Sequence, residues 1–336
     1  MPSFFGPRLA ARRRLLALGV LAVVPSGALF ACGARTALTA PEEAVVAAGD
    51  AQATDVRRDA PRDAALETLP PIDARPRDSS RNDCPDAEAT LVYVVTEATE
   101  LLAFNPAAGT FRRIGALACP ARRNYRPFSM AVDRAGVAYV LYEEETTVNP
   151  GTQLFRVSTL TAACVDTGFV GGQQGFASFG MGFSSDQGGP AETLFVASDS
   201  DVNGSALGSI DTTSFAVTRI GTFEPQIFRA ELTGTGDGRL FAFYDNGGGN
   251  GSAPSFIGEV DKASGKIIAE DTLASLGQGS GWAFAFWGGD FYTFTSPTGA
   301  ASRVNRFNPT TKALTQVATY PSRIVGAGVS TCAPSR

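Results

Sequence analysis

The sequence predicts an all-β domain over residues 86–334, and three features indicate it. Short runs in which apolar and polar residues alternate recur from about residue 90 onward, bounded by Gly, Asp, Asn and Pro, which is typical of strands and turns. No long segment has the apolar periodicity of a helix. Similar segments also recur in a fixed order, which indicates a repeat architecture.

Each repeat contains an alternating strand and a strand that ends in a tight turn. The alternating strands are "TLVYVV" from Thr90, "VAYVLY" from Val137, "TLFVAS" from Thr193, "RLFAFY" from Arg239 and "DFYTFT" from Asp290. Asn, Asp and Ser start tight turns because their side chains accept hydrogen bonds from the backbone. Such residues begin the five turns at intervals of 53, 53, 50 and 47 residues: Asn105, Ser158, Asp211, Asp261 and Asn308.

A third segment, an apolar strand followed by a Gly-containing turn, precedes the alternating strand in every repeat except the first. A segment of this type stands instead at the C-terminus, "IVGAGVSTC", from Ile324 to Cys332. In a closed ring this last strand completes the first sheet. We therefore predict a single β-propeller of five four-stranded blades, strands A to D from centre to rim, with the C-terminal strand closing blade 1. An ordinary β-sandwich is the alternative.

The first 31 residues have the pattern of an export signal. A basic region with Arg12, Arg13 and Arg14 precedes an apolar stretch that ends in Leu-Phe-Ala-Cys. This tetrapeptide resembles the lipobox of bacterial lipoproteins, which implies cleavage before Cys32 and lipidation of that cysteine. Gly33 then favours the outer membrane over the inner one. The alternative is an ordinary secretory signal that leaves Cys32 free.

Residues 32–85 are predicted to be a disordered linker between the lipid anchor and the propeller. They are rich in Ala, Asp, Arg and Pro, and no aromatic residue occurs between Phe30 and Tyr93. Such a segment cannot bury enough apolar surface to offset the entropy lost on ordering.

At the level of its repeats, the propeller segment resembles bacterial propellers of the quinoprotein-like and gluconolactonase-like kinds. Together with the lipobox and the linker, the chain resembles uncharacterised bacterial lipoproteins with a C-terminal propeller. The resemblance implies the fold, an exported location and membrane attachment through Cys32. It implies no particular activity.

Four cysteines follow the anchor cysteine, and an even number in an exported domain favours disulfides. Cys332 ends the closing strand, and Cys84 precedes the strand with which it pairs, so we expect a bond between them. Cys119 and Cys164 pair by elimination. Free, half-buried thiols remain the alternative.

The chain contains no histidine, which excludes Ser-His-Asp and Cys-His catalysis and His-ligated metal sites. A calcium site is predicted at Asp199, Asp201 and Asn203 in "DSDVNGS", where oxygen ligands alternate as at the start of a calcium loop. The position of the closing glutamate is occupied by Ile210, and an ordinary hairpin loop is the alternative.

The B–C and D–A loops should emerge on one face of the ring, which we predict to be the binding face. They are long and hold most of the clustered charge of the domain. The residues expected to bind there are Arg122, Arg123, Tyr125, Arg126, Glu143, Glu144, Glu145 and Asp245. Solvated surface loops are the alternative. The aromatic run of Trp282, Phe284, Phe286 and Trp287 is expected in the core between blades, although a sugar-stacking surface is the other interpretation.

These features favour a membrane-anchored binding or scaffolding module, with an unknown protein or glycan as its partner. A calcium-dependent lactonase-like hydrolase and a glycan-binding or adhesion module are the alternatives. The formal net charge of −5 becomes about −9 when the four arginines of the signal are removed. Nothing in this charge pattern indicates nucleic-acid binding.

Overall fold

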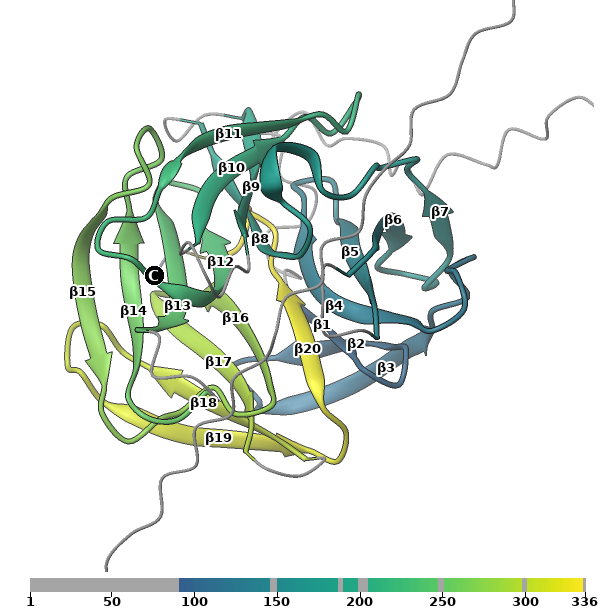
Figure 1. The fold of residues 1–336 in the computed structure, drawn as a ribbon. Coiled ribbons are helices and arrows are strands. Elements are labelled where there is room, and N and C mark those ends of the chain that lie inside the picture. Colours follow the sequence, from purple (N-terminus) through teal and green to yellow (C-terminus); the bar gives the residue numbers. More distant parts are fainter. Residues whose placement is uncertain are drawn as a thin grey trace, which may run out of the picture. The chain divides into compact units, whose positions relative to one another are not determined.

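The computed structural model describes residues 91–145, 150–186, 190–198, 205–246, 251–297 and 301–334. All of them belong to the second of the two compact units of the chain, Ala64–Arg336. Their strands form five separate four-stranded antiparallel sheets, arranged as the blades of a propeller (Figure 1). The predicted fold is confirmed.

In every blade the strands run in order from the innermost, A, to the outermost, D. Blade 1 consists of β20 (Ile324–Gly328), β1 (Val92–Thr96), β2 (Glu100–Asn105) and β3 (Thr110–Ala116). Blade 2 consists of β4 (Tyr125–Val132), β5 (Val137–Glu144), β6 (Thr152–Ser158) and β7 (Cys164–Asp166). Blade 3 consists of β8 (Phe179–Ser185), β9 (Glu192–Ser198), β10 (Ala206–Ile210) and β11 (Val217–Thr222). Blade 4 consists of β12 (Phe228–Gly234), β13 (Leu240–Asp245), β14 (Ser255–Val260) and β15 (Ile267–Leu273). Blade 5 consists of β16 (Gly281–Trp287), β17 (Asp290–Ser296), β18 (Ser302–Phe307) and β19 (Leu314–Tyr320). One 3₁₀ turn, η1 (Gln173–Gly175), lies between blades 2 and 3.

The C-terminal strand closes the ring as predicted. Strand β20 pairs antiparallel with β1, with Tyr93 opposite Gly328 and Val95 opposite Gly326. In Figure 1, yellow β20 lies beside blue β1, although almost the whole domain separates them in sequence. The first and last strands of the ring therefore share one sheet, in which β20 is the innermost strand and pairs with β1.

Small residues in the A strands allow neighbouring blades to approach closely. A Cβ at Gly180 would lie 2.0 Å from the carbonyl oxygen of Ala230, on the next blade. One at Gly326 would lie 2.9 Å from the carbonyl carbon of Ser129. Only glycine fits where two backbones come this close.

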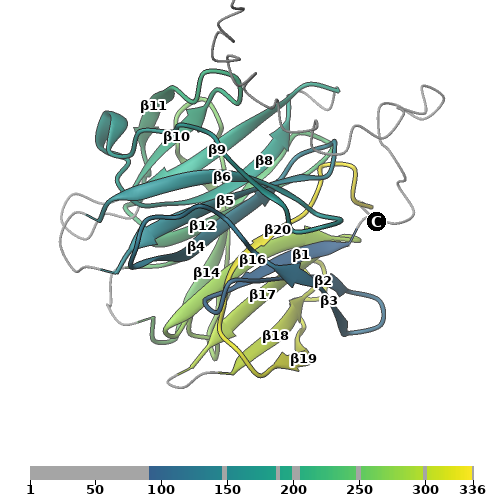
Figure 2. The same ribbon diagram turned by 90° about the vertical axis from the view of Figure 1, so that its right-hand side faces the viewer.

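The core consists of five apolar clusters, one in each interface between adjacent blades. For example, Leu101 of blade 1 and Val140 of blade 2 belong to one cluster, and both are fully buried. Phe104 of blade 1 packs edge-on against Phe294 of blade 5, with ring centroids 5.6 Å apart. Figure 2 shows the blade sheets from the side. Burial between sheets, rather than within any one sheet, stabilises the ring.

All five predicted turn residues accept hydrogen bonds from the backbone at the start of their C–D turns. Asn105 accepts from the amide of Ala108 at 3.1 Å, and Asn308 accepts from the amide of Thr311 at 2.8 Å. The other three, Ser158, Asp211 and Asp261, make the corresponding bonds. The five residues that recur in the sequence therefore share one role, which is to accept the backbone hydrogen bonds that form these turns.

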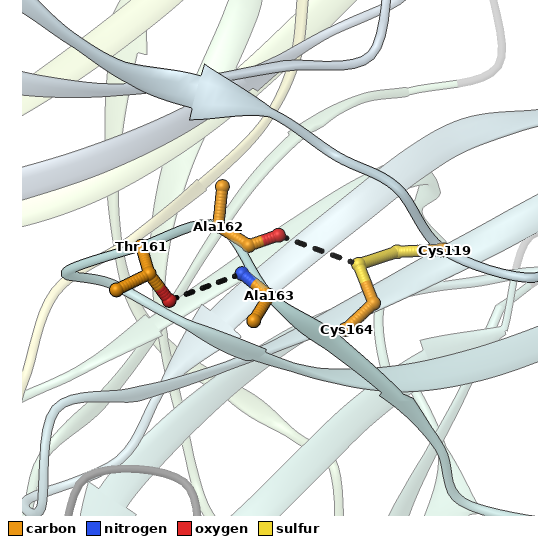
Figure 3. The surroundings of a disulfide bond; sticks show 5 residues. All are labelled: Cys119, Thr161, Ala162, Ala163 and Cys164. Atoms are coloured by element: carbon orange, nitrogen blue, oxygen red, sulfur yellow. Dashed lines mark hydrogen bonds between the residues drawn. A yellow bond between two sulfur atoms is a disulfide. The ribbon is translucent and has the colours of Figure 1, made fainter.

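Cys119 and Cys164 form a disulfide, with their Cα atoms 4.9 Å apart (Figure 3). The bond joins the segment after strand D of blade 1 to strand D of blade 2. Cys332 is also disulfide-bonded. Cys84 lies outside the described residues, so its bond to Cys332 stays a prediction. Disulfides persist in oxidising compartments, and the Cys119–Cys164 bond thus indicates an extracytoplasmic location.

In the part of the chain that the structure describes, no helical segment has the length and apolarity that a membrane crossing requires. The signal, Cys32 and the linker all precede residue 91 and lie outside the described residues.

Candidate ligand site at the channel mouth

The B–C and D–A loops lie on the same face of the ring, because they hydrogen-bond to one another. In blade 1, the amide of Glu97 donates to the carbonyl oxygen of Arg323 at 3.0 Å. In blade 2, the amide of Glu145 donates to the carbonyl oxygen of Asn124 at 2.9 Å. We call this side of the ring the loop face.

A cavity of about 310 Å³ opens on the loop face, where the A strands of blades 5, 1 and 2 begin. We call it the mouth cavity. This volume lies at the lower end of the range of about 300–1,000 Å³ that is typical of small-ligand sites. Its lining residues are Glu97, Arg126, Pro127, Phe128, Glu145, Ser280, Gly281, Trp282, Arg323 and Val325.

Two aromatic rings form part of its wall, one from blade 2 and one from blade 5. Phe128 and Trp282 are half-buried and perpendicular, with centroids 6.0 Å apart. The guanidinium carbon of Arg229 lies 3.7 Å from the centre of the indole ring of Trp282. Arg229 also donates to the carbonyl oxygen of Gly279 at 2.7 Å. These contacts hold the indole in one position, since a cation over its face and a hydrogen-bonded guanidinium limit its movement.

Two ion pairs flank these rings. Arg126 lies 3.4 Å from Glu145, and both side chains are more than half exposed. Arg323 lies 3.4 Å from Glu97, and these two are about one-third exposed. Exposed ion pairs contribute only about 0–1 kcal/mol each to stability. Their charged groups can therefore turn to a ligand at little cost in the free energy of folding.

Two N–H donors in the lining have no hydrogen-bond partner within the described residues. They are Nε1 of Trp282 and Nε of Arg323, and both atoms are buried. A buried donor without an acceptor costs about 1–3 kcal/mol. Both atoms are covered by neighbouring atoms, so a ligand in the mouth cavity does not reach them in this arrangement.

Deeper in the ring than the mouth cavity, side chains from non-adjacent blades meet across the centre. Ser129 follows Phe128 in β4 and donates to the carboxylate of Glu231 in β12 at 2.9 Å. Glu231 is 1% exposed. The channel is filled at this depth, and a ligand in the mouth cavity therefore enters from the loop face.

The eight residues predicted for the binding face have different surroundings. Arg126 and Glu145 line the mouth cavity. Arg122 instead borders a separate groove between blades 2 and 3, and Arg123 is exposed. Tyr125 is 7% exposed and contributes its ring to the core, because β4 begins at this residue and turns it inward.

The remaining three lie at the ends of B strands. Glu143 accepts a hydrogen bond from the hydroxyl of Ser178 on the next blade, and Glu144 is half-buried. Asp245 is buried and lies 3.7 Å from Nε of Arg229. Glu143 and Asp245 therefore have protein partners, whereas Glu145 in the same loop is more than half exposed.

Sequence reasoning predicted only Arg126 and Glu145 among the ten residues that line the mouth cavity, and it missed Phe128, Trp282, Arg323 and Glu97 among the others. Trp282 was expected in the core between blades, but it is only half-buried because it is the second residue of β16, at the open end of the ring. Phe284, farther along this strand, is fully buried as expected. Glu97 follows strand B of blade 1, and Arg323 follows strand D of blade 5. These positions correspond to the loops of blade 2 that were predicted to bind, and this correspondence was the signal available in the sequence.

At the opposite end of the channel lies a second polar cluster. The carboxylate of Glu192 accepts hydrogen bonds from the amide of Arg134 at 2.7 Å and the hydroxyl of Thr331 at 2.8 Å. Burial raises the pKa of Glu192 to about 7, and these two hydrogen bonds oppose the rise. Burial also raises the pKa of the neighbouring Asp133.

No three acidic or cysteine side chains in the described ranges come together as a metal site. Asp199, Asp201 and Asn203 lie outside those ranges. Calcium binding at this loop therefore stays a prediction.

No protein-family model matches the sequence, and no curated protein matches it either. Among solved structures, the chain is similar to TolB from Acinetobacter baumannii, with 15% identity, a TM-score of 0.36, and coverage of 69% of this chain but only 53% of TolB. It is also similar to an alpha-L-arabinofuranosidase from Clostridium thermocellum ATCC 27405, with 12% identity, a TM-score of 0.38, and coverage of 61% and 72%. A protein of unknown function from Dyadobacter fermentans has 10% identity, a TM-score of 0.38, and coverage of 63% and 68%. At such identities and TM-scores, none of these proteins indicates what this chain binds.

Proposed function

We propose that this chain is an exported lipoprotein whose propeller is a binding or scaffolding module, with its ligand site in the mouth cavity. The observation that supports the site is a cavity that combines two aromatic rings with two ion pairs. Such a combination of apolar wall and few polar groups is typical of ligand sites.

The membrane is the first partner in this proposal. Lipidation of Cys32 attaches the chain to the outer membrane, because two or three acyl chains hold a protein stably in a bilayer. The linker of residues 32–85 then separates the propeller from the membrane surface, as expected for a chain of this composition.

The anchor is tested by expressing the full chain and its Cys32→Ser variant and separating membrane from soluble fractions. The wild type should sediment with the outer membrane, and mass spectrometry should find acyl chains on the residue at position 32. The variant should be soluble or retain an uncleaved signal. A variant that still sediments with its signal removed would contradict the lipid anchor.

Binding in the mouth cavity is tested with the intrinsic fluorescence of Trp282. The chain has two tryptophans, and Trp287→Phe leaves Trp282 as the single reporter. A library of neutral, anionic and cationic fragments should contain compounds that change its emission saturably. If no class of fragment does so while the variant is folded, the mouth cavity is not a ligand site.

A further inference from the structure

We propose that the mouth cavity binds the end of a neutral glycan, with one sugar residue held between its rings and ion pairs. This inference rests on the proposed function and specifies the chemical class of its ligand. It is supported by the charge balance, the apolar wall and the closed floor of the cavity.

The charge balance of the cavity favours a neutral ligand. Its two guanidinium groups, of Arg126 and Arg323, are each 3.4 Å from a carboxylate, of Glu145 and Glu97. An anionic ligand is attracted by the two guanidinium groups and repelled by the two carboxylates, and a cationic ligand is repelled by the guanidinium groups and attracted by the carboxylates. Neither gains from the site as a whole.

Sugar hydroxyls fit such alternating charges because each both donates and accepts. A guanidinium only donates, and a carboxylate only accepts. One hydroxyl can therefore accept from Arg323 while its own O–H donates to Glu97.

The apolar part of the wall provides a surface for the other side of a sugar. Phe128 and Trp282 come from blades on either side of blade 1 and face the same cavity. A sugar ring has faces of C–H groups that pack against aromatic carbon, and its edge carries the hydroxyls. An amphipathic ring of this kind uses both the aromatic wall and the polar rim.

The closed floor indicates that a chain end binds, rather than the middle of a chain. The Ser129–Glu231 hydrogen bond spans the ring one residue below Phe128. A glycan can therefore insert its terminal residue into the cavity of about 310 Å³, and the rest of its chain extends over the loop face.

The experiment uses the full chain carrying Trp287→Phe and follows Trp282 fluorescence. The probes are neutral trisaccharides of glucose, xylose, mannose and N-acetylglucosamine. Trigalacturonic acid, a trimer of glucosamine and an uncharged tripeptide serve as anionic, cationic and non-sugar arms. Saturable binding of at least one neutral trisaccharide, tighter by about tenfold or more than that of any charged trimer, is the expected result.

Variants of the protein that retains Trp287, measured by calorimetry, separate the contributions of the groups. Trp282→Phe replaces the indole with a smaller aromatic ring, and should weaken binding by about tenfold. Glu97→Gln should weaken it less, since the amide still accepts. Arg112→Ala on the exposed face of β3 is the matched control and should leave affinity unchanged.

The outcomes distinguish the inference from the proposed function. Tighter, Trp282-dependent binding of a charged trimer or of the tripeptide overturns the glycan inference and leaves the mouth cavity as a ligand site. Neutral glycans that bind equally to wild type and Trp282→Phe also overturn it. If no probe changes Trp282 emission, the inference fails, and the fragment library then decides whether the cavity binds anything.

Discussion

The residue at the start of each C–D turn has the same task in all five blades, although its identity varies. Asn308 accepts hydrogen bonds from the amides of Thr310 and Thr311 and donates to Asp290 at 2.7 Å. Ser158 accepts from two amides in the corresponding turn of blade 2. The requirement is therefore for a short side chain with an acceptor.

Asn308→Ala should lower the free energy of unfolding by about 1 kcal/mol, because two turn amides lose their acceptor. Asn308→Ser should lower it less, since serine performs the same role at position 158. Urea denaturation of the three proteins measures both effects. Equal losses in the two variants would contradict this account of the turn.

Glu192 is the residue whose ionisation couples the fold to pH. Its pKa is raised from 4.5 to about 7 by burial, so the folded protein binds its proton more tightly than the unfolded chain does. The stabilisation by protonated Glu192 is complete below pH 4.5 and is lost as the pH rises through 7. Asp133, with its raised pKa, adds to this trend.

The wild type should therefore lose up to about 3 kcal/mol of unfolding free energy from this group between pH 4.5 and 7. Glu192→Gln cannot ionise at this position and should show a correspondingly flatter dependence. Urea denaturation at a series of pH values measures it, with Glu224→Gln on the exposed surface as the control. Parallel curves for wild type and Glu192→Gln would contradict the assignment.

At the scale of the element, the closing strand β20 is held by pairing on one side and by close backbone contact on the other. It pairs with β1, and its glycines lie against β4 of blade 2. A Cβ at Gly326 would meet the backbone nitrogen of Met130 at 2.8 Å and the carbonyl carbon of Ser129 at 2.9 Å. Backbone atoms cannot move aside as the end of a long side chain can.

Gly326→Ala should accordingly destabilise the domain by about 1–3 kcal/mol. Gly115→Ala in β3 is the matched control, because the nearest atom to its new Cβ would be the Cβ of Ala162, at 3.1 Å. Thermal unfolding of the two variants should show a clearly larger loss for Gly326→Ala. Similar losses would mean that β20 adapts to the added methyl group.

The Cys119–Cys164 disulfide links the outer parts of blades 1 and 2 across 45 residues. Loop-closure entropy predicts a contribution of about 4 kcal/mol for a loop of this length. The double variant Cys119→Ala/Cys164→Ala should therefore unfold at lower urea concentration, with a loss of about 2–4 kcal/mol in the free energy of unfolding. A variant with unchanged stability would show that the bond constrains the unfolded chain less than its length implies.

At the scale of the whole molecule, closure of the ring makes each blade depend on two neighbours. The five apolar clusters form a continuous series, in which blade 1 packs against blade 2 on one side and blade 5 on the other. No single sheet of the described residues buries its apolar side chains alone. The domain should therefore fold as one cooperative unit, as repeat proteins with coupled neighbours do.

Removal of residues 324–336 tests this dependence. The truncated chain loses β20, leaves β1 with one unpaired edge at the centre of the ring, and exposes part of two clusters. It should lose its cooperative thermal transition and aggregate, because an open apolar strand edge pairs with other chains. A truncated protein with a sharp transition near that of wild type would contradict obligatory closure.

The architecture of the domain could be predicted from local patterns in the chain. Alternating strands, acceptor residues at regular turns and the displaced C-terminal strand define the blades and the closure, because strand period and turn chemistry are local properties. The same local signals placed the charged loops, including Arg126 and Glu145, on one face.

Which loop-face residues share a cavity depends instead on how the blades pack. Tyr125 turns into the core while Phe128, three residues along the same strand, faces the mouth cavity. Trp282 and Arg323 come from blade 5 and from the loop before β20, far from Phe128 in sequence, and meet it because the ring brings the A strands together. Side-chain direction at a strand end and contact between blades depend on twist and long-range packing, which no local pattern encodes.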